Sequence, residues 1–208
     1  MLKWLLALAL ATVHAASMAI EEPAYEVERR LDGDDVELRR YAPYVVAQVR
    51  VDGPSDRADS EGFRLLAGYI FGKNKGERRL EMTAPVTRAA AEPVKLEMTA
   101  PVTRSADAQG FLVQFVLPKA VTLATAPEPI DPRVELREVP ARRVAAIRYS
   151  GTWSQANYDE HLERLRAALR AAKIEPAGEP TLSRYNGPMT PWFMRRNEIW
   201  LPLEAGGR

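Results

Sequence analysis

A repeat of long period is the feature that most restricts how this chain can fold. The stretch VELRRYAPYVVAQVRVDG, from Val36 to Gly53, aligns without gaps to VELREVPARRVAAIRYSG, from Val134 to Gly151. Alternating apolar residues, such as Val45, Ala47 and Val49 in the first copy, predict strands with one apolar face. Each copy therefore predicts two strands joined by a proline-containing bend, and the duplication predicts a domain built from two related halves.

An amphipathic helix is predicted after the first copy of the repeat. Phe63, Leu66, Ala67 and Ile70 recur at the spacing of one helix face. Gly72 follows them as a stop signal, because glycine readily adopts the backbone conformation that ends many helices. The first strand pair is therefore expected to lead into a helix that ends before Gly72.

A second helix is predicted in the equivalent place after the second copy. Tyr158, Leu162, Leu165 and Leu169 form its apolar stripe, and Ser154 is the candidate N-cap residue. The arginines of this segment fall mostly on the opposite face. The two copies of the repeat are thus each followed by a helix that has one face suited to a shared core.

Strands are predicted to resume after both helices, in GFLVQFVLP from Gly110 to Pro118 and in RRNEIWLPL from Arg195 to Leu203. The chain then consists of two strand-helix-strand halves. This order predicts an α+β domain with pseudo-twofold symmetry, in which a curved, mainly antiparallel sheet carries both helices. A cleft between the halves is the natural place for a ligand.

A second repeat has a short period. The string LEMTAPVTR occupies Leu80 to Arg88 and again Leu96 to Arg104. The alternation of residues in each copy places Met82, or Met98, on one face with the other apolar residues. The two copies are therefore expected to be strands of one hairpin with matched methionines, and the proline in each predicts an edge or a bulge beside an opening.

The first nineteen residues have the pattern of a secretory signal peptide. Lys3 precedes an apolar run from Trp4 to Val13, and small residues follow up to Ala19. The run is about half of the roughly twenty residues that span a bilayer, so cleavage is favoured over a retained anchor. We expect residues 20–208 to form a single domain, periplasmic or secreted, with no stable membrane insertion after cleavage.

Charge and cysteine content exclude several kinds of site. The sequence has no cysteine, which removes disulfides, thiolate metal ligands and cysteine nucleophiles. Without Lys3 the acidic and basic side chains balance, whereas a nucleic-acid interface needs a basic excess on one face. Nucleic acid is therefore not an expected partner, and protein partners stay open.

Several segments, in this order along the chain, resemble the SOUL haem-binding family. They include GKNKGERRLEMTAPV from Gly72 to Val86, the second LEMTAPV, FLVQFVLP, DPRVELREVPARRVAAIRYSG, and RYNGPMTPWFMRRNEIWL from Arg184 to Leu201. The resemblance covers nearly all of residues 20–208. It implies a distorted barrel-like sheet with two helices, and a non-covalent haem or porphyrin site near the first helix.

Carried onto this sequence, the resemblance places a macrocycle against the first predicted helix. The alternative for the helix residues is that they only fill the core, and the alternative for the cations after the helix is a solvated turn. Basic residues at the rim would pair with the haem propionates. The candidate residues are Phe63, Leu66, Ala67 and Ile70 under the ring, with Lys73, Lys75 and Arg78 at the rim.

Axial ligation of a haem iron has few candidates after residue 19. His161, on the second predicted helix, is the single histidine there, and it either ligates the ligand or has a structural role. Met82 and Met98 are thioethers that could line an apolar cavity, although core filling is the other interpretation. The resemblance supplies no matching histidine on the sheet, so apolar capture is the main alternative, and the metal-binding residues stay undetermined.

The hypothesis that follows is non-covalent binding of haem or a related tetrapyrrole, as a carrier or buffer in the export compartment. No phosphate-binding glycine loop, nucleophile elbow or histidine-rich cluster is present in the sequence, so no catalytic residues are assigned. Two alternatives remain. One is a protein-interaction or stress-response module with a vestigial pocket, and the other is an enzyme that acts on a small apolar substrate.

Overall fold

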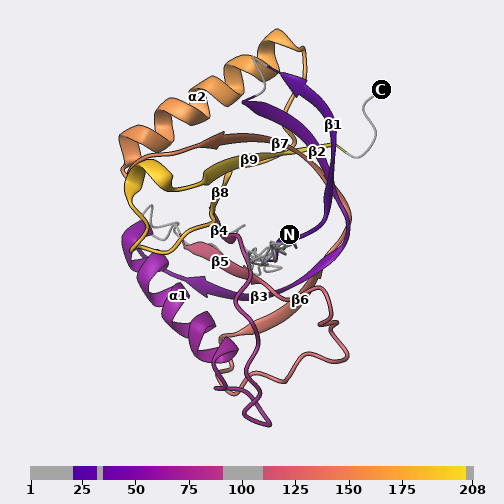
Figure 1. Ribbon diagram of the computed structural model, residues 1–208, viewed down its shortest axis with the longest axis vertical. Helices are drawn as coiled ribbons and strands as arrows, with labels where there is room; N and C mark the ends of the chain where they lie inside the picture. The colour runs from indigo at the N-terminus through magenta and orange to yellow at the C-terminus, as the bar shows by residue number, and fades with distance from the viewer. Residues whose placement is uncertain (1–20, 32–34, 91–109, 205–208) are drawn as a thin grey trace, which may run out of the picture.

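A computed structural model of the chain describes residues 21–31, 35–90 and 110–204. In this part of the chain, nine strands form one curled antiparallel sheet, and two helices pack on its outer side (Figure 1). The predicted α+β fold is therefore confirmed. The elements are β1 (Tyr25–Leu31), β2 (Val36–Tyr41), β3 (Tyr44–Val51), α1 (Ser55–Ile70), β4 (Val86–Ala90), β5 (Phe111–Val116), β6 (Glu135–Val139), β7 (Arg142–Tyr149), α2 (Gln155–Ala171), β8 (Thr181–Arg184), the short 3-10 helix η1 (Trp192–Met194) and β9 (Asn197–Leu203).

The two copies of the long repeat pair with each other in the sheet. β2 lies antiparallel to β7, from Val36 opposite Ile147 to Tyr41 opposite Arg142, and β3 lies against β6 in the continuation of this register. The strand order is β1-β2-β7-β9-β8-β4-β5-β3-β6. In the two halves, β2 corresponds to β6, β3 to β7, β4 to β8 and β5 to β9. Exchanging each strand for its equivalent reverses the order and, apart from β1, leaves it unchanged. This symmetry confirms the predicted pseudo-twofold domain.

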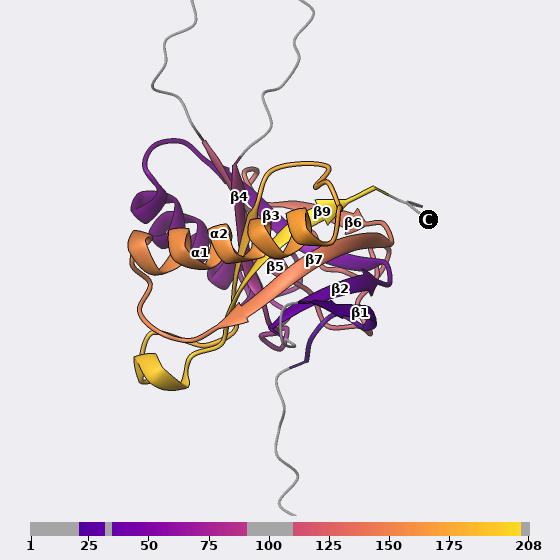
Figure 2. The same ribbon diagram turned by 90° about the horizontal axis from the view of Figure 1, so that it is seen from above.

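Local residues mark the start of α2 and the end of α1. The Ser154 hydroxyl accepts a hydrogen bond from the Asn157 backbone N–H at 3.3 Å, which satisfies a free amide in the first turn of α2. α1 ends at Ile70, and Gly72 two residues later has a φ of +112°, a value that glycine adopts without a Cβ clash. Figure 2 shows the two helices on the same side of the molecule.

The outer face of the sheet carries two apolar clusters, one under each helix. Leu165 and Leu169 of α2 are buried against β7 and β9, and Leu66 and Ile70 of α1 are buried against β3 and β5. Burial of this apolar area is the main favourable term that holds the helices on the sheet. A smaller cluster around Trp200 fills part of the concave face.

A buried carboxylate on the concave face ties β2 to β9 and to the residue that follows β8. Glu198 on β9 is fully buried and accepts hydrogen bonds from Arg39 (2.7 and 3.2 Å), Arg196 (2.9 and 3.0 Å), Tyr185 (2.8 Å) and Trp200 (2.7 Å). Burial alone would raise the pKa of Glu198, but the hydrogen bonds from Arg39 and the two positive charges hold it below its usual range. The carboxylate is ionised and fully satisfied.

The short repeat differs from its prediction. In the first copy only Val86–Ala90 is a strand, and residues 77–85 follow an irregular path, so the prediction of a strand from Leu80 to Arg88 is wrong for its first half. Pro85, which has no N–H for a ladder, stands directly before the strand. The second copy, with Met98, lies outside the described residues. β4 pairs with β5 on one side and with β8 on the other, so the predicted hairpin with the second copy is wrong for Val86–Arg88, and β4 is not an edge strand.

None of the described helices combines the length and the apolar character that crossing a bilayer requires.

Candidate ligand-binding site

An apolar cleft of about 720 Å³ lies between α1, the middle of the sheet and the segment that follows β8. Phe63 projects into it from α1, with its ring edge-on to Phe115 at 5.3 Å and 42% of the side chain exposed. Met82, 39% exposed, lines it from the segment before β4, and Leu182 lines it from β8. The volume and the apolar walls are typical of a site for a small organic ligand.

The close approach of α1 to the sheet depends on one glycine. Gly62 faces Val113 on β5, and a Cβ added at this position would lie 2.7 Å from a Val113 methyl carbon. Real Cβ atoms do not approach so closely, so a larger residue would push the helix outward. Gly62 therefore sets the depth of the cleft beside Phe63.

Charged side chains form one end of the cleft. The Asp59 carboxylate on α1 pairs with Arg88 at 3.0 Å and with Arg184 at 2.9 Å. Burial lowers the pKa of Arg184, and its Nε is buried without a hydrogen-bond partner. Two guanidinium groups lie against one carboxylate here, and the unpartnered Nε of Arg184 suits a carboxylate on a ligand.

An aromatic side chain from the other half closes this end. Trp153, in the loop before α2, has the guanidinium of Arg184 at 4.6 Å from its ring centre and that of Arg195 at 4.2 Å. Its indole N–H donates a hydrogen bond to Asn197 at 3.0 Å. Trp153 is thus fixed in orientation at the wall of the cleft, although α1 and Trp153 belong to different halves of the domain.

The structure separates the residues predicted to lie under a macrocycle. Phe63 and Met82 line the cleft. Leu66 and Ile70 point into the core and are fully buried, and Ala67 packs partly buried against the same cluster. A ligand in the cleft would contact α1 through Asp59, Ser60 and Phe63 rather than through the whole predicted stripe.

The predicted rim cations lie beyond the other end of α1. Lys75 pairs with Glu128 at 2.6 Å, and the Arg78 guanidinium donates to a backbone carbonyl at 3.0 Å. Lys73 is exposed and runs beside Gly68. This turn is organised by the buried Asn74, whose side chain bonds to the backbone of Tyr69 and Arg78. None of the three cations lines the cleft.

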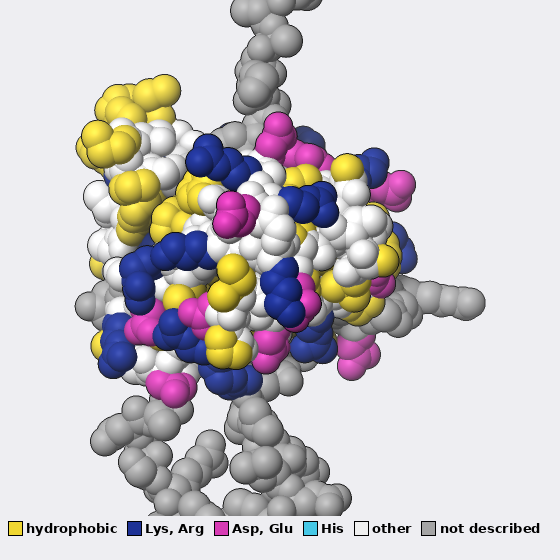
Figure 3. All heavy atoms as spheres, turned by 90° about the horizontal axis from the view of Figure 1, so that it is seen from below, with side chains coloured by type: hydrophobic (Ala, Val, Ile, Leu, Met, Phe, Trp, Pro, Cys, Tyr) yellow, Lys and Arg dark blue, Asp and Glu magenta, His cyan; other side chains and the backbone are white. Residues whose placement is uncertain are grey.

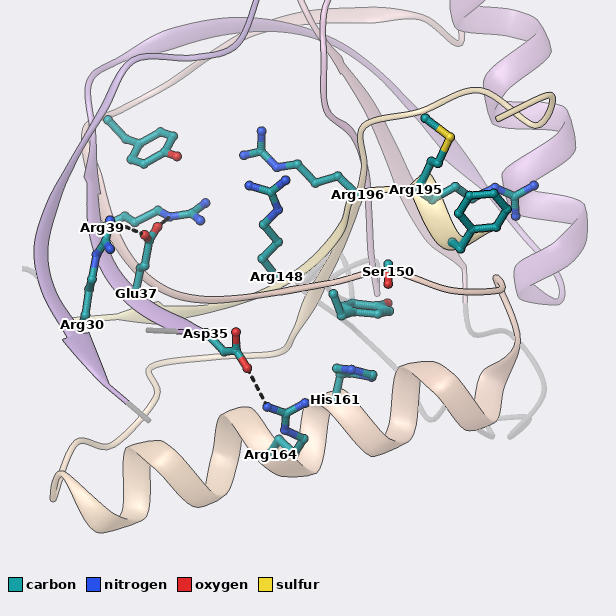
Figure 4. Close-up of a pocket in the computed structure, with 14 residues that line it drawn as sticks. Arg30, Asp35, Glu37, Arg39, Arg148, Ser150, His161, Arg164, Arg195 and Arg196 are labelled. Carbon is teal, nitrogen blue, oxygen red and sulfur yellow. Dashed lines mark hydrogen bonds and ion pairs between the residues drawn. The ribbon is translucent and has the colours of Figure 1, made fainter. Parts of the chain in front are cut away.

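A second cavity, of about 830 Å³, opens at the end of β7 and is lined mainly by charged side chains (Figure 4). His161 lies in its wall, with its ring stacked on Tyr149 at 4.3 Å. The Nδ1 atom is 2.7 Å from the backbone oxygen of Asn157 and therefore carries the proton, because a carbonyl only accepts. His161 belongs to this polar cavity and does not line the apolar cleft.

Sequence reasoning missed the polar end of the cleft. Asp59, Arg88 and Arg184 come from an exposed helix face and two short strands, and single charged residues at such positions are usually solvated. Trp153 and Tyr185, which also line the cleft, stand in or beside loops that carry no periodic pattern. The LEMTAPVTR string, which contains Arg88, and the segment from Arg184 to Leu201 that resembles the SOUL family marked this region in advance, but neither predicted that these residues meet.

Comparison with known families decides the ancestry of this arrangement. The family model described as "SOUL heme-binding protein" matches residues 20–202. The chain belongs to the SOUL family. Human Heme-binding protein 2 is 27% identical over 191 residues, which cover 90% of this chain and 88% of the human protein. Mouse Heme-binding protein 2 is 36% identical over 72 residues, which cover 33% of this chain and 35% of the mouse protein.

Solved structures share the fold of this SOUL protein at low identity. An uncharacterized conserved protein from Listeria innocua has a TM-score of 0.61 at 11% identity, covering 82% of this chain and 92% of that one. The C-terminal domain of EcmrR has a TM-score of 0.55 at 11% identity, covering 81% and 96%. A hydrolase from Listeria innocua has a TM-score of 0.56 at 14% identity, covering 82% and 92%. These identities show the fold alone.

The residues of the cleft fit a tetrapyrrole with acidic side chains. Its walls are apolar and partly aromatic, which suits a flat macrocycle, and the buried Arg184 with its unpartnered Nε suits a propionate. Within the described residues, no group of three or more histidine or acidic side chains could hold a separate metal ion.

Proposed function

We propose that this SOUL protein binds haem or a related tetrapyrrole non-covalently in the cleft beside α1. The observation that carries the proposal is the cleft itself, an apolar cavity with Phe63 on one wall and the Arg88–Asp59–Arg184 group at one end. Family membership and the likeness to Heme-binding protein 2 support it.

Apolar capture is the proposed mode of binding. Among the residues that line the cleft, Met82 is the side chain whose thioether could reach an iron, and the Tyr185 hydroxyl is already bonded to Glu198. The protein would thus hold the macrocycle through its faces and its carboxylates. Metal-free protoporphyrin should then bind about as tightly as haemin.

We also propose that the protein acts as a carrier or buffer rather than as an enzyme, in the periplasm or outside the cell. The signal-peptide pattern of residues 1–19 supports export.

Titration with haemin tests the proposal. The full chain should shift the Soret band and lose tryptophan fluorescence at micromolar haemin, because Trp153 lines the cleft. Phe63→Glu places a charge on the apolar wall and should weaken binding at least about tenfold. Phe71→Glu is the matched control, since Phe71 is 58% exposed beyond the end of α1 and should bind normally.

Further variants separate the modes of binding. Arg184→Gln should weaken haemin more than a porphyrin without carboxylates, and His161→Ala should leave affinity unchanged. Equal affinities of wild type and Phe63→Glu, with both folded by circular dichroism, would exclude the α1 cleft. A large loss in His161→Ala would assign the ligand to the second cavity instead.

A further inference from the structure

An apolar tip projects from the surface in the segment between β8 and β9. We use this name for Met189, Trp192, Phe193 and Met194, which are 93%, 58%, 61% and 65% exposed. The short helix η1 carries three of them, and the Trp192 and Phe193 rings pack edge to face at 5.6 Å. Figure 3 shows a projecting group of hydrophobic side chains at the position of η1, with Lys or Arg side chains nearby. Four large apolar side chains exposed together are unfavourable in water, and such a patch typically marks a surface that contacts a partner or a membrane.

The tip is held in place from behind. Arg195 donates hydrogen bonds to the backbone oxygens of Thr190 at 2.8 Å and Pro188 at 2.9 Å, and its guanidinium also stacks on Trp153 at 4.2 Å. The backbone N–H of Gly151 donates to the Trp192 oxygen at 3.0 Å. These contacts fix the backbone of the segment in the position that exposes its apolar side chains.

A basic pocket adjoins the tip. It is the cavity of Figure 4, and Phe193 and Met194 of the tip form part of its lining. Arg148 points into it from β7, and no carboxylate pairs with its exposed side chain in the described part of the chain. Arg195 donates its hydrogen bonds to backbone carbonyls, and among the described residues no carboxylate pairs with it either. The Arg164 guanidinium pairs with Asp35 at 2.9 Å at the outer rim.

We infer that the apolar tip and the basic pocket together form a docking surface for an anionic phospholipid membrane. Aromatic and thioether side chains on a short projection can enter the headgroup region, and arginines behind them can contact lipid phosphates. One ligand chemistry thus accounts for both features, since a phospholipid presents an apolar layer and a phosphate within a few ångströms. The surface uses neither Phe63 nor Arg184, although Trp153 and Pro188, which support the tip through Arg195, also line the α1 cleft.

Lipid fits this surface better than a protein partner. The tip is a convex projection of four side chains rather than a groove, and its cationic border has uncompensated charge. A second copy of the chain would have to offer an acidic apolar pocket, whereas the cavities described here are an apolar cleft with a cationic end and a basic pocket. Charge complementarity therefore selects an anionic lipid surface.

Vesicle binding tests the inference with the full chain. Wild type should sediment with vesicles of phosphatidylglycerol and phosphatidylcholine in equal parts, and much less with phosphatidylcholine alone. Trp192→Ser with Phe193→Ser should weaken binding at least about tenfold. The matched control, Phe71→Ser with Ile130→Ser, removes two side chains that are 58% and 62% exposed elsewhere and should bind like wild type.

The electrostatic part has its own pair of variants. Arg148→Gln should weaken binding to the anionic vesicles about fivefold, the usual contribution of one arginine at a charged membrane surface. Arg137→Gln, an exposed arginine on β6, should have no such effect. Thermal unfolding of every variant confirms that the fold is intact.

Fluorescence quenching distinguishes the tip from the apolar N-terminal segment, which all variants share. The emission of Trp192 is the difference between the spectra of wild type and Trp192→Phe. Vesicles of brominated phosphatidylcholine and phosphatidylglycerol should quench this component. Sedimentation without quenching of this component would overturn the inference. So would loss of vesicle binding in inorganic phosphate at constant ionic strength, which would assign a free anion, or a tip-dependent dimer in sedimentation equilibrium, which would assign a second copy.

Discussion

The two halves of the domain descend from one repeat, yet they pack their helices differently. α2 buries its stripe of Leu162, Leu165 and Leu169 completely against β7 and β9. α1 buries Leu66 and Ile70 but leaves Phe63 at the mouth of an apolar cleft. The same architecture thus supports a closed interface on one side and an open one on the other.

The difference extends to the polar groups. The Glu198 carboxylate is buried and satisfied by side chains of both halves, Arg39 of the first and Tyr185 and Arg196 of the second. Asp59 of the first half is shared by Arg88 and by Arg184 of the second half, whose Nε has no hydrogen-bond partner. The comparison teaches that the cluster around Glu198 mainly stabilises the fold, while the cluster at the α1 cleft keeps an unsatisfied donor for a ligand.

The largest expected effect follows from removing the charge of Glu198. Glu198→Gln leaves the buried guanidinium of Arg39 and that of Arg196 without their counterion, so the free energy of unfolding should fall by about 3–5 kcal/mol. Urea denaturation measures this loss. Glu138→Gln, on an exposed position of β6, should change stability by less than about 0.5 kcal/mol, and equal effects would remove the proposed division of roles.

Truncating one side chain on each helix compares the halves directly. Leu165→Ala on α2 removes a fully buried side chain and should destabilise the protein by about 2–5 kcal/mol. Phe63→Ala on α1 should lose only about 1 kcal/mol, because its ring is partly exposed, and should instead weaken haemin binding. If Phe63→Ala destabilises as much as Leu165→Ala with unchanged haemin affinity, the cleft is only core.

Alkaline unfolding reports on one tyrosine in each half. Burial raises the pKa of Tyr69 on α1 to about 12 and that of Tyr149 on β7 to about 12. A raised pKa favours the neutral folded form, so each contribution is complete below about pH 10 and is lost as the pH rises to about 12. Two pKa units correspond to about 2–3 kcal/mol per tyrosine.

Tyr69→Phe and Tyr149→Phe should therefore each reduce the loss of unfolding free energy above about pH 10 by the contribution of one tyrosine. Urea unfolding at a series of pH values measures this. Tyr69→Phe should also lose about 1 kcal/mol at neutral pH, because the Tyr69 hydroxyl donates to the Pro127 oxygen at 2.9 Å. An unchanged alkaline slope in both variants would show that other groups control it.

Two glycines of α1 give the smallest and sharpest contrast. Gly62→Ala brings a methyl group against Val113 and should destabilise by about 1–3 kcal/mol while changing the cleft. Gly68→Ala meets only the flexible Lys73 side chain, 3.2 Å away, and should be neutral or stabilise by up to about 1 kcal/mol. Thermal unfolding and haemin titration of the pair measure both effects, and a neutral Gly62→Ala would contradict the close helix approach.

The periodic spacing of apolar residues predicted the strands and helices that bury one face. The repeat gave β2, β3, β6 and β7, and the stripes gave both helices, because buried faces impose a regular spacing. β1 was not predicted, since its side chains are mostly exposed and carry no apolar alternation. The stripe of α1 could not reveal that Leu66 faces the core while Phe63 faces a cleft, because that choice depends on the neighbouring sheet.

The candidate site was predicted only in part for the same reason. Phe63 and Met82 were marked by pattern and by resemblance, whereas Asp59, Arg184 and Trp153 meet only after both halves have paired. Charged residues that are far apart in the sequence become neighbours only through this pairing of the halves. The methionine symmetry expected from the second LEMTAPVTR copy stays a prediction, because Met98 lies outside the described residues.

The pairing of β2 with β7 and of β3 with β6 means that each half completes its sheet with an edge strand from the other. A single half produced alone would expose an unpaired strand edge and would be expected to recruit a second copy by exchanging that strand. The present chain is, in effect, a domain-swapped dimer joined into one polypeptide. Its folding must bring together strands about a hundred residues apart, so it should fold slowly and as one unit.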